Sequence, residues 1–289
     1  MTRTLITGAT DGIGKITATN LAKMGQEIII HGRNERKAQQ VVEEIKQDSG
    51  NENISYLISY LIADLTDMTA IQEMVNDFYK EFDHLDVLIN NAGAVLDDTI
   101  VKTKDGLEAT FALNVMAPFL LTKLLLPALE KSSDGRVINM SSATYRQAKP
   151  NKSDFNSFEN KSGQSRYGTS KLYVILNTES WAKKLASEGI QNVTVNVSHP
   201  GAVATNFGQN SDNGWLNNLV YKIALKVMPA PENGAITNTF LASDSGVEKI
   251  SGAFFDNKKK QIQPKISVEE QQLAQPLFEY CEKIAAQFN

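Results

Sequence analysis

Short apolar runs alternate with longer amphipathic segments along most of the chain. The apolar runs predict strands at residues 4–7, 27–31, within 54–63, and at 87–89, 136–140, 193–197 and 252–256. The segments between and after them predict helices that end near Gly25, begin at Asn34, and cover 68–82, 105–130, 167–187, 232–242 and 268–288. Alternation of this kind is typical of an α/β protein with a parallel sheet that is buried by helices on both faces.

Composition supports one globular domain and excludes several classes of partner. The chain has 289 residues, of which 42% are hydrophobic and 21% charged, and no linker divides it. A net charge of −4 gives no basic surface for nucleic acid or an anionic membrane. Cys281 is the only cysteine, and His31, His84 and His199 are scattered, so we predict neither an intrachain disulfide nor a metal site.

The apolar segments do not predict a membrane protein. The chain enters its first strand almost at Met1, which leaves no room for a signal peptide or an anchor in the sequence at hand. The longest apolar region, 117–129, contains Lys123 and is too short to span a bilayer. We therefore expect a soluble, cytoplasmic protein without a membrane partner.

Two motifs carry chemistry. Residues 7–14 place glycines between the first strand and the first helix, where a pyrophosphate could meet backbone amides; the residues concerned are Gly8, Thr10, Asp11, Gly12, Ile13 and Gly14. Tyr167 and Lys171 are four residues apart and should share one helix face, where the ammonium would lower the pKa of the phenol. Taken alone, that second pair fits a solvated helix face better.

Together these motifs identify a family resemblance. The spacing Gly-x-x-x-Gly-x-Gly, joined to Tyr167 and Lys171, resembles the short-chain dehydrogenases/reductases over the whole chain. The resemblance implies one domain with a Rossmann-type doubly wound parallel sheet. Residues 1–140 would form its cofactor-binding half and 141–289 its catalytic and substrate half.

The resemblance also implies roles for four residues in a hydride transfer. Tyr167 matches the acid/base, and Lys171 matches the lysine that lowers its pKa and binds the nicotinamide ribose. Ser142, rather than Ser141, matches the serine that polarises the carbonyl, and Asn114 matches the asparagine that supports a proton-relay water. As single residues, Ser142 could equally cap a turn and Asn114 could be a polar helix residue.

The expected cofactor is NADP(H), with NAD(H) possible. The second predicted strand, 27–31, is followed by Arg33 and Asn34 rather than by an acid, and the guanidinium of Arg33 would bind a 2′-phosphate. Against this, Asp11 opposes added negative charge, and Arg33 could be an ordinary solvated residue. The family pattern adds further cofactor-binding positions: Asp64, Leu65, Asn91, Ala92, Gly93, Pro200, Gly201, Val203 and Thr205. Asp64 could also cap a helix, and the neighbouring Asn90 is better interpreted as a structural residue.

Within the family, the long interval from Ser142 to Tyr167, the residue Arg33 and the His-Pro-Gly segment at 199–201 resemble the retinol dehydrogenase-like branch. That resemblance implies a small-molecule substrate that is an apolar aldehyde, ketone or alcohol. Many members of that branch carry an N-terminal anchor. Candidate walls of an apolar pocket, which could equally be ordinary packing, are Phe155, Phe158, Phe207, Trp215, Leu216, Leu219, Val220 and Tyr221. The helices bearing Asn114 and Tyr167 often pair between copies in this family, which implies a homodimer or homotetramer. The alternatives are a redox sensor that binds NADP without turnover and, less well matched in spacing, a nucleotide-sugar epimerase/dehydratase.

Overall fold

The computed structural model describes residues 1–49, 57–156, 158, 161–201 and 231–288. Their strands form one sheet in the order β3-β2-β1-β4-β5-β6-β7-β8, parallel except for β8. The strands are β1 (Arg3–Ile6), β2 (Glu27–Gly32), β3 (Ile58–Ile62), β4 (Val87–Asn90), β5 (Gly135–Met140), β6 (Val193–Ser198), β7 (Phe254–Phe255) and β8 (Gln261–Ile262). The predicted doubly wound α/β fold is therefore confirmed.

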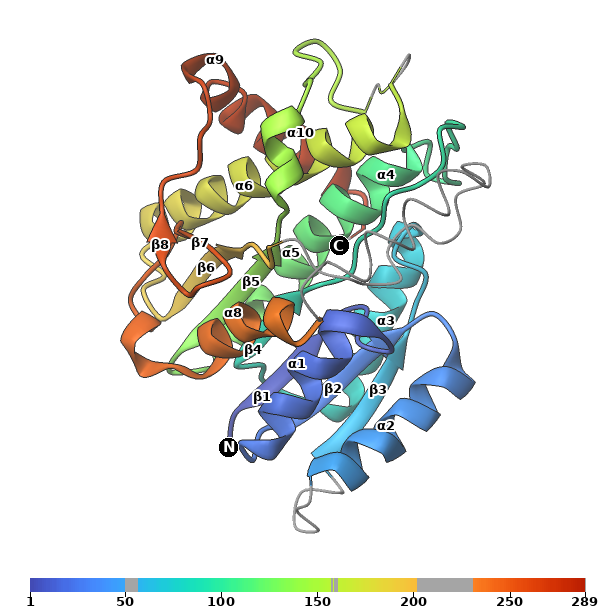
Figure 1. Cartoon of the computed structure of the whole chain (residues 1–289), viewed down its shortest axis with the longest axis vertical. Coiled ribbons are helices and arrows are strands. Elements are labelled where there is room, and N and C mark those ends of the chain that lie inside the picture. The colour runs from blue at the N-terminus through green and yellow to red at the C-terminus, as the bar shows by residue number, and fades with distance from the viewer. Residues whose placement is uncertain (50–56, 157, 159–160, 202–230, 289) are drawn as a thin grey trace.

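Helices lie on both faces of the sheet (Figure 1). The α-helices are α1 (Gly12–Lys23), α2 (Glu35–Ser49), α3 (Met68–Glu81), α4 (Ala109–Phe111), α5 (Ala117–Leu129), α6 (Gly163–Ser187), α8 (Pro231–Ser243), α9 (Val268–Gln271) and α10 (Ala274–Ala285). Between them lie the π-helical turn η2 (Ala112–Met116) and the 3₁₀ turns η3 (Ala143–Gln147) and η4 (Ser245–Val247). Helices α1, α2 and α8 cover one face of the sheet, and α3, α5 and α6 cover the other.

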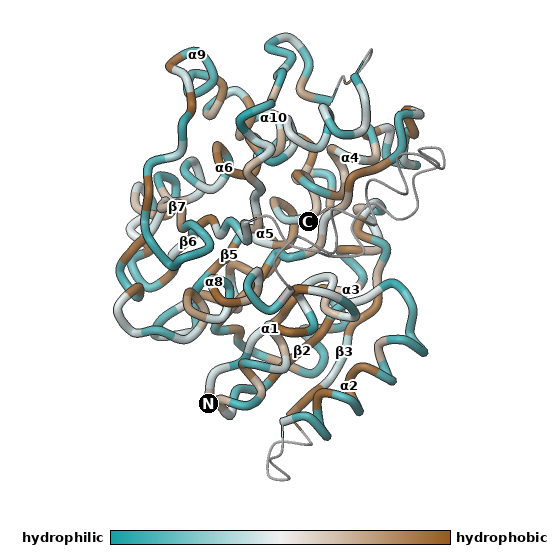
Figure 2. The backbone as a smooth tube through the Cα atoms, in the orientation of Figure 1, coloured by the Kyte–Doolittle hydropathy of each residue, from teal (hydrophilic) through white to brown (hydrophobic). Residues whose placement is uncertain are grey.

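The strands supply both cores because successive side chains point to opposite faces of the sheet. In β1, Leu5 packs with α3, α5 and α6, whereas Ile6 packs with α1, α2 and α8. Leu88 and Ile89 of β4 divide in the same way. Apolar colouring follows the strands in Figure 2, while α2 alternates between apolar and polar along its length. Burial on both faces explains why these strands read as continuous apolar runs.

The structure differs from the predicted elements at three places. The strand predicted at 252–256 is not the last strand of the sheet, since the antiparallel β8 follows it. A strand of two residues, such as β8, is too short to leave a periodic signal in the sequence. The terminal helix predicted at 268–288 divides into α9 and α10. The helix predicted at 105–130 begins only at Ala109, because Glu108 accepts a hydrogen bond from the Phe111 amide and caps it.

The interruption of that helix lies in η2, directly before Pro118. Pro118 has no amide hydrogen to donate to the carbonyl of Asn114, and the amide of Ala117 instead bonds the carbonyl of Ala112, five residues back. The irregularity directly before Pro118 is thus a π-helical turn, and it contains Asn114.

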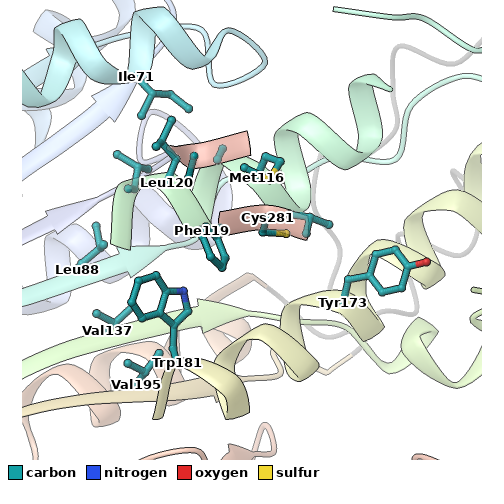
Figure 3. Close-up of a cluster of buried hydrophobic side chains, with 14 of the residues drawn as sticks. Ile71, Leu88, Met116, Phe119, Leu120, Val137, Tyr173, Trp181, Val195 and Cys281 are labelled. Carbon is teal, nitrogen blue, oxygen red and sulfur yellow. The ribbon is translucent and has the colours of Figure 1, made fainter. Parts of the chain in front are cut away.

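The helical stretch Ala109–Leu129 is longer than the apolar run at 117–129 suggested. Among the described residues it is the one stretch long and apolar enough to cross a membrane. Within the fold, however, 67% of its most apolar window is buried. Figure 3 shows Met116, Phe119 and Leu120 of this stretch in one buried cluster with Leu88 and Val137 of the sheet. Its apolar character therefore serves the core.

Helix α10 packs against α5 and α6 of the same chain. The Phe278 ring lies 5.1 Å from that of Phe119 and 5.2 Å from that of Trp181, and Cys281 is fully buried beside them (Figure 3). The family resemblance assigned these same helices to pairing between copies. In this chain α10 covers part of that surface.

Candidate active site

The glycine-rich stretch 7–14 forms a tight turn between β1 and α1. Gly8 and Gly12 have φ of 62° and 51°, in the left-handed region that favours glycine. A Cβ atom on Gly14 would lie 2.5 Å from Nδ2 of Asn91, so the close approach of α1 to the end of β4 also requires glycine. Nδ2 of the Asn91 side chain donates to the carbonyl of Thr7 at 2.8 Å and holds the turn.

Asn90, which was predicted to be structural, belongs to a buried amide network. Its Nδ2 donates to Oδ1 of Asn139 at 2.8 Å, and Nδ2 of Asn139 donates to Oγ1 of Thr178 at 3.0 Å. The network joins β4, β5 and α6 within the protein interior. Asn90 is thus structural, while Ala92 and Gly93 continue along the edge of the sheet, half-buried.

Arg33 lies exposed after β2, and no ion pair involving it occurs within the described ranges. Asn34 caps α2 by accepting from the amide of Lys37 at 3.0 Å. The ammonium of Lys37 is 3.0 Å from the carboxylate of Asp11. Lys37 was not among the predicted site residues, although its position one helical turn after Arg33 was a usable signal. The charge of Asp11, which argued against a 2′-phosphate, is paired here.

His31 is a second residue whose contribution the sequence did not reveal. Its Nδ1 accepts from the amide of Gly8 at 3.2 Å, and its Nε2 donates to the carbonyl of Ala63 at 3.1 Å. Burial lowers the pKa of His31 to about 4, so the ring is neutral at physiological pH. The ring therefore ties the glycine turn to the end of β3.

Asp64 and Leu65 follow β3 but face different surroundings. Asp64 is exposed and accepts from the amide and hydroxyl of Thr66 at 2.9 and 2.8 Å. It does not cap the next helix, because Asp67 does so by accepting from the amide of Ala70. The side chain of Leu65 is buried in the core, so any contact it makes with a cofactor would come from its backbone.

The Pro200 and Gly201 pair follows β6 at the same edge of the sheet. Gly201 has φ of 79°, and its amide donates to Nδ1 of His199 at 3.2 Å. The predicted cofactor contacts Val203 and Thr205 lie outside the described residues, as do the pocket candidates from 207 to 221. The other pocket candidates, Phe155 and Phe158, are buried in the core and pack as ordinary interior rings.

Tyr167 and Lys171 share a buried face of α6, with exposures of 7% and 3%. The ammonium of Lys171 is 5.4 Å from the centre of the Tyr167 ring and donates to the carbonyl of Met140 at 2.8 Å. The hydroxyl of Ser142 hydrogen-bonds the phenol of Tyr167. The hydroxyl of Ser141 instead donates to the carbonyl of Lys171 at 2.8 Å. Of the two serines, only Ser142 therefore faces the phenol.

Burial controls the protonation of this group. It lowers the pKa of Lys171 to about 7, because an ammonium without water is costly. It also raises the pKa of Tyr167 above its ordinary value, while the Ser142 hydrogen bond acts in the opposite direction. The expected lowering of the Tyr167 pKa is therefore not seen in this structure, because desolvation of the phenol is larger than the opposing effect of the Ser142 hydrogen bond.

Asn114 connects this group to the loop after β4. Its Oδ1 accepts from the amide of Ala94 and its Nδ2 donates to the carbonyl of Ala94, both at 3.0 Å. Nδ2 also donates to Oγ of Ser170 at 3.2 Å. A Cβ atom on Gly93 would lie 2.9 Å from Oδ1 of Asn114 and 3.1 Å from Nζ of Lys171. Glycine at 93 therefore leaves room for both side chains.

Comparisons with known proteins agree with this architecture. A model of the short chain dehydrogenase family matches residues 2–214. The chain belongs to the short-chain dehydrogenase/reductase family, and it is an oxidoreductase acting on CH–OH groups.

Its relatives place it in the retinol dehydrogenase-like branch. Human polyprenol dehydrogenase is 38% identical over 261 residues, which are 89% of this chain and 77% of that protein. Mouse retinol dehydrogenase 14 is 35% identical over 269 residues, or 90% and 79%. A Shigella flexneri short-chain dehydrogenase complexed with NADP matches with a TM-score of 0.66 at 26% identity, covering 89% of this chain and 97% of that one. An Escherichia coli counterpart complexed with NADPH gives 0.66 at 25% identity, covering 89% and 96%.

Proposed function

We propose that the protein interconverts an apolar aldehyde or ketone and its alcohol with NADP(H). The observation that carries the proposal is the meeting of Ser142, Tyr167 and Lys171 at the carboxyl end of β5, with Asn114 bonded to the same helix. Ligand sites in open α/β sheets lie outside the carboxyl ends of the strands.

Each of these residues has a defined task in the proposal. Tyr167 gives a proton to the carbonyl oxygen, or takes one from the alcohol, and its raised pKa keeps the phenol protonated for reduction. Ser142 donates a hydrogen bond to the same oxygen. Lys171 binds the ribose and, when protonated, favours the phenolate of Tyr167. Asn114 supports the water through which protons reach solvent. The chemistry that NADP(H) supplies when bound is hydride donation or acceptance.

The described residues fit a dinucleotide. The glycines at 8, 12 and 14 bring the backbone close to the edge of the sheet, and Arg33 follows β2 with its side chain exposed, which supports a role in binding a 2′-phosphate. We propose that the turn at 8–14, Arg33, Asn34 and Asp64 hold the adenosine and phosphates of NADP(H). NAD(H) is the weaker cofactor. The remaining contacts would come from residues 65, 91–93, 200, 201, 203 and 205.

The relatives support an apolar substrate. Polyprenol and retinol, which two relatives are named for, are both long hydrocarbon alcohols with one polar end. We also propose a cytoplasmic location. We also propose a homodimer or homotetramer, as the family resemblance implies.

The test is a panel of aldehydes and ketones of increasing chain length, followed through the absorbance of reduced nicotinamide with NADPH and with NADH. Turnover with NADPH that improves with the chain length of the substrate supports the proposal. A preference for short, polar substrates contradicts the proposed apolar substrate. NADPH binding without turnover of any panel member would favour the redox sensor instead.

A further inference from the structure

Arg166, the residue before Tyr167, occupies an unfavourable position. It lies in the first turn of α6, where the positive end of the helix dipole repels a cation. Its side chain is also fully buried, although arginine rarely leaves water unless it is paired. The reason for such a residue must lie in its tertiary contacts.

The guanidinium of Arg166 joins the start of α6 to the loop after β4. Nη1 donates to the carbonyl of Asp98 at 3.0 Å and to that of Lys161 at 2.8 Å. Nη2 donates to the carbonyls of Asp97 and Thr99. Three consecutive carbonyls of one loop are thus held by one side chain.

Nε of Arg166 lies 3.3 Å from Oε1 of Glu108, which is also buried. Glu108 caps the helical stretch that contains Asn114, accepting from the amide of Phe111 at 2.9 Å and from the hydroxyl of Thr110 at 3.0 Å. Its own amide donates to Oδ1 of Asn156 at 2.7 Å. The ion pair therefore links the beginnings of the two helical segments that carry Tyr167 and Asn114.

The loop at 94–99 lies between these two segments and is held at both ends. Asn114 binds both backbone groups of Ala94, and Arg166 binds the carbonyls at 97–99. The amide of Gly163 adds a hydrogen bond to Oδ1 of Asp98 at 2.7 Å. A shift of Arg166 would therefore move Tyr167, its neighbour in the chain, relative to this loop.

We propose that Arg166 and Glu108 are a positioning pair that sets the phenol of Tyr167 against Ser142 and holds the loop at 94–99 in register with Asn114. This inference rests on the proposed function. The pair touches neither substrate nor cofactor and acts through Tyr167 and Asn114.

The test compares Arg166→Gln with Arg136→Gln. Arg136 is a matched control, because it is also buried and binds the carboxylate of Asp134 and the carbonyls of Leu241 and Asp244, but it lies at the start of β5. Both variants should lose a similar amount of thermal stability. Only Arg166→Gln should lower kcat, by about 10- to 100-fold, with KM for NADPH unchanged, because misplacement of reacting groups acts on the chemical step. Equal kcat in the two variants would overturn the proposal.

Hydrogen exchange supplies a readout that does not need activity. Arg166→Gln should speed exchange of the amides at 94–101 and 163–168, and leave those at 4–16 unchanged; unchanged exchange at 94–101 contradicts the proposal. Should this variant not fold, Arg166→Lys replaces it, since lysine keeps the charge but loses the planar fork that binds several carbonyls. Absence of turnover in the wild type would contradict the proposed function, while the exchange result would still decide the role of the pair.

Discussion

The interior of the proposed active site and its proposed cofactor-binding edge differ in their exposure to solvent. Tyr167, Lys171 and Asn114 are each less than a tenth exposed and hydrogen-bond to fixed partners. Arg33 and Asp64, at the ends of β2 and β3, are exposed to solvent. Proton transfer depends on groups that are held in place before the reaction begins, away from water. A phosphate, in contrast, can be recognised by a solvated cation, because its charge acts through water and tolerates movement.

The difference predicts where each kind of substitution acts. Changes in the interior should alter turnover and folding stability together, since the same buried contacts serve both. Changes at the edge should alter cofactor affinity alone, and salt should weaken their effect. The following predictions separate the two regions, in order of expected size.

Replacing Tyr167 with Phe should have the largest effect. The substitution keeps the ring but removes the proton donor, so we expect turnover to fall by about 10²- to 10⁴-fold while NADPH binding survives. Tyr173→Phe is the control, since this phenol lies two turns further along α6 and its ring is fully buried. Steady-state rates with NADPH measure both variants. Near-normal turnover of Tyr167→Phe would mean that another group carries the proton.

Lys171→Met should reveal the cost of burying an ammonium. The pKa of Lys171 is about 7 in the folded state, below its ordinary value of 10.5. Below pH 7 Lys171 is protonated in both the folded and the unfolded protein, so the free-energy cost of burying its ammonium is present in full. Between pH 7 and 10.5 only the unfolded protein keeps the proton on Lys171, so the cost of burying the ammonium falls as the pH rises. The gain in unfolding free energy from Lys171→Met should therefore shrink by about 2–4 kcal/mol between pH 6 and pH 10.

Denaturant titrations at several pH values, without cofactor, measure this gain. Lys184→Met, at the more exposed end of the same helix, is the control and should show no such gain, because Lys184 pairs with Glu188. A gain from Lys171→Met that is constant with pH would show that Lys171 stays protonated in the folded protein.

Arg33→Ala should weaken NADPH binding by about 10- to 100-fold through the loss of charge-assisted hydrogen bonds. NADH lacks the 2′-phosphate and should bind as before. Dissociation constants from nicotinamide fluorescence give the comparison. The control Lys46→Ala removes one positive charge at the other end of α2, away from the site. It should change the affinity for neither NADPH nor NADH. Equal weakening of NADPH and NADH binding by Arg33→Ala would contradict the role of Arg33 in binding the 2′-phosphate.

Lys37→Ala should have the smallest effect. It frees the carboxylate of Asp11 from its exposed ion pair, and we expect NADPH affinity to fall about two- to fivefold. Asp11→Asn should raise that affinity slightly, and both effects should disappear at high salt. An effect of Lys37→Ala that persists at high salt would point to a direct contact with the phosphate.

Much of the fold could be predicted because the strands are buried on both faces. Runs such as 27–31 and 87–89 were continuous enough to be recognised, and their order in the sheet follows the family that the glycine turn indicated. The elements that were missed are short or irregular. The strand β8 has two residues. The π-helical turn η2 depends on the missing amide hydrogen of Pro118 and on the tertiary contacts of Asn114. Such features have no period along the chain.

The site divides along the same line. Spacing alone placed Tyr167 above Lys171 and a glycine turn before α1, since these are local relations within one helix or one turn. The tertiary structure decided which serine faces the phenol, that desolvation dominates the pKa of Tyr167, and that a buried arginine holds the loop at 94–99. Those outcomes depend on distance and burial between segments far apart in the chain. The sequence determined the family and the residue types at the site, and only the packed structure determined their electrostatics and support.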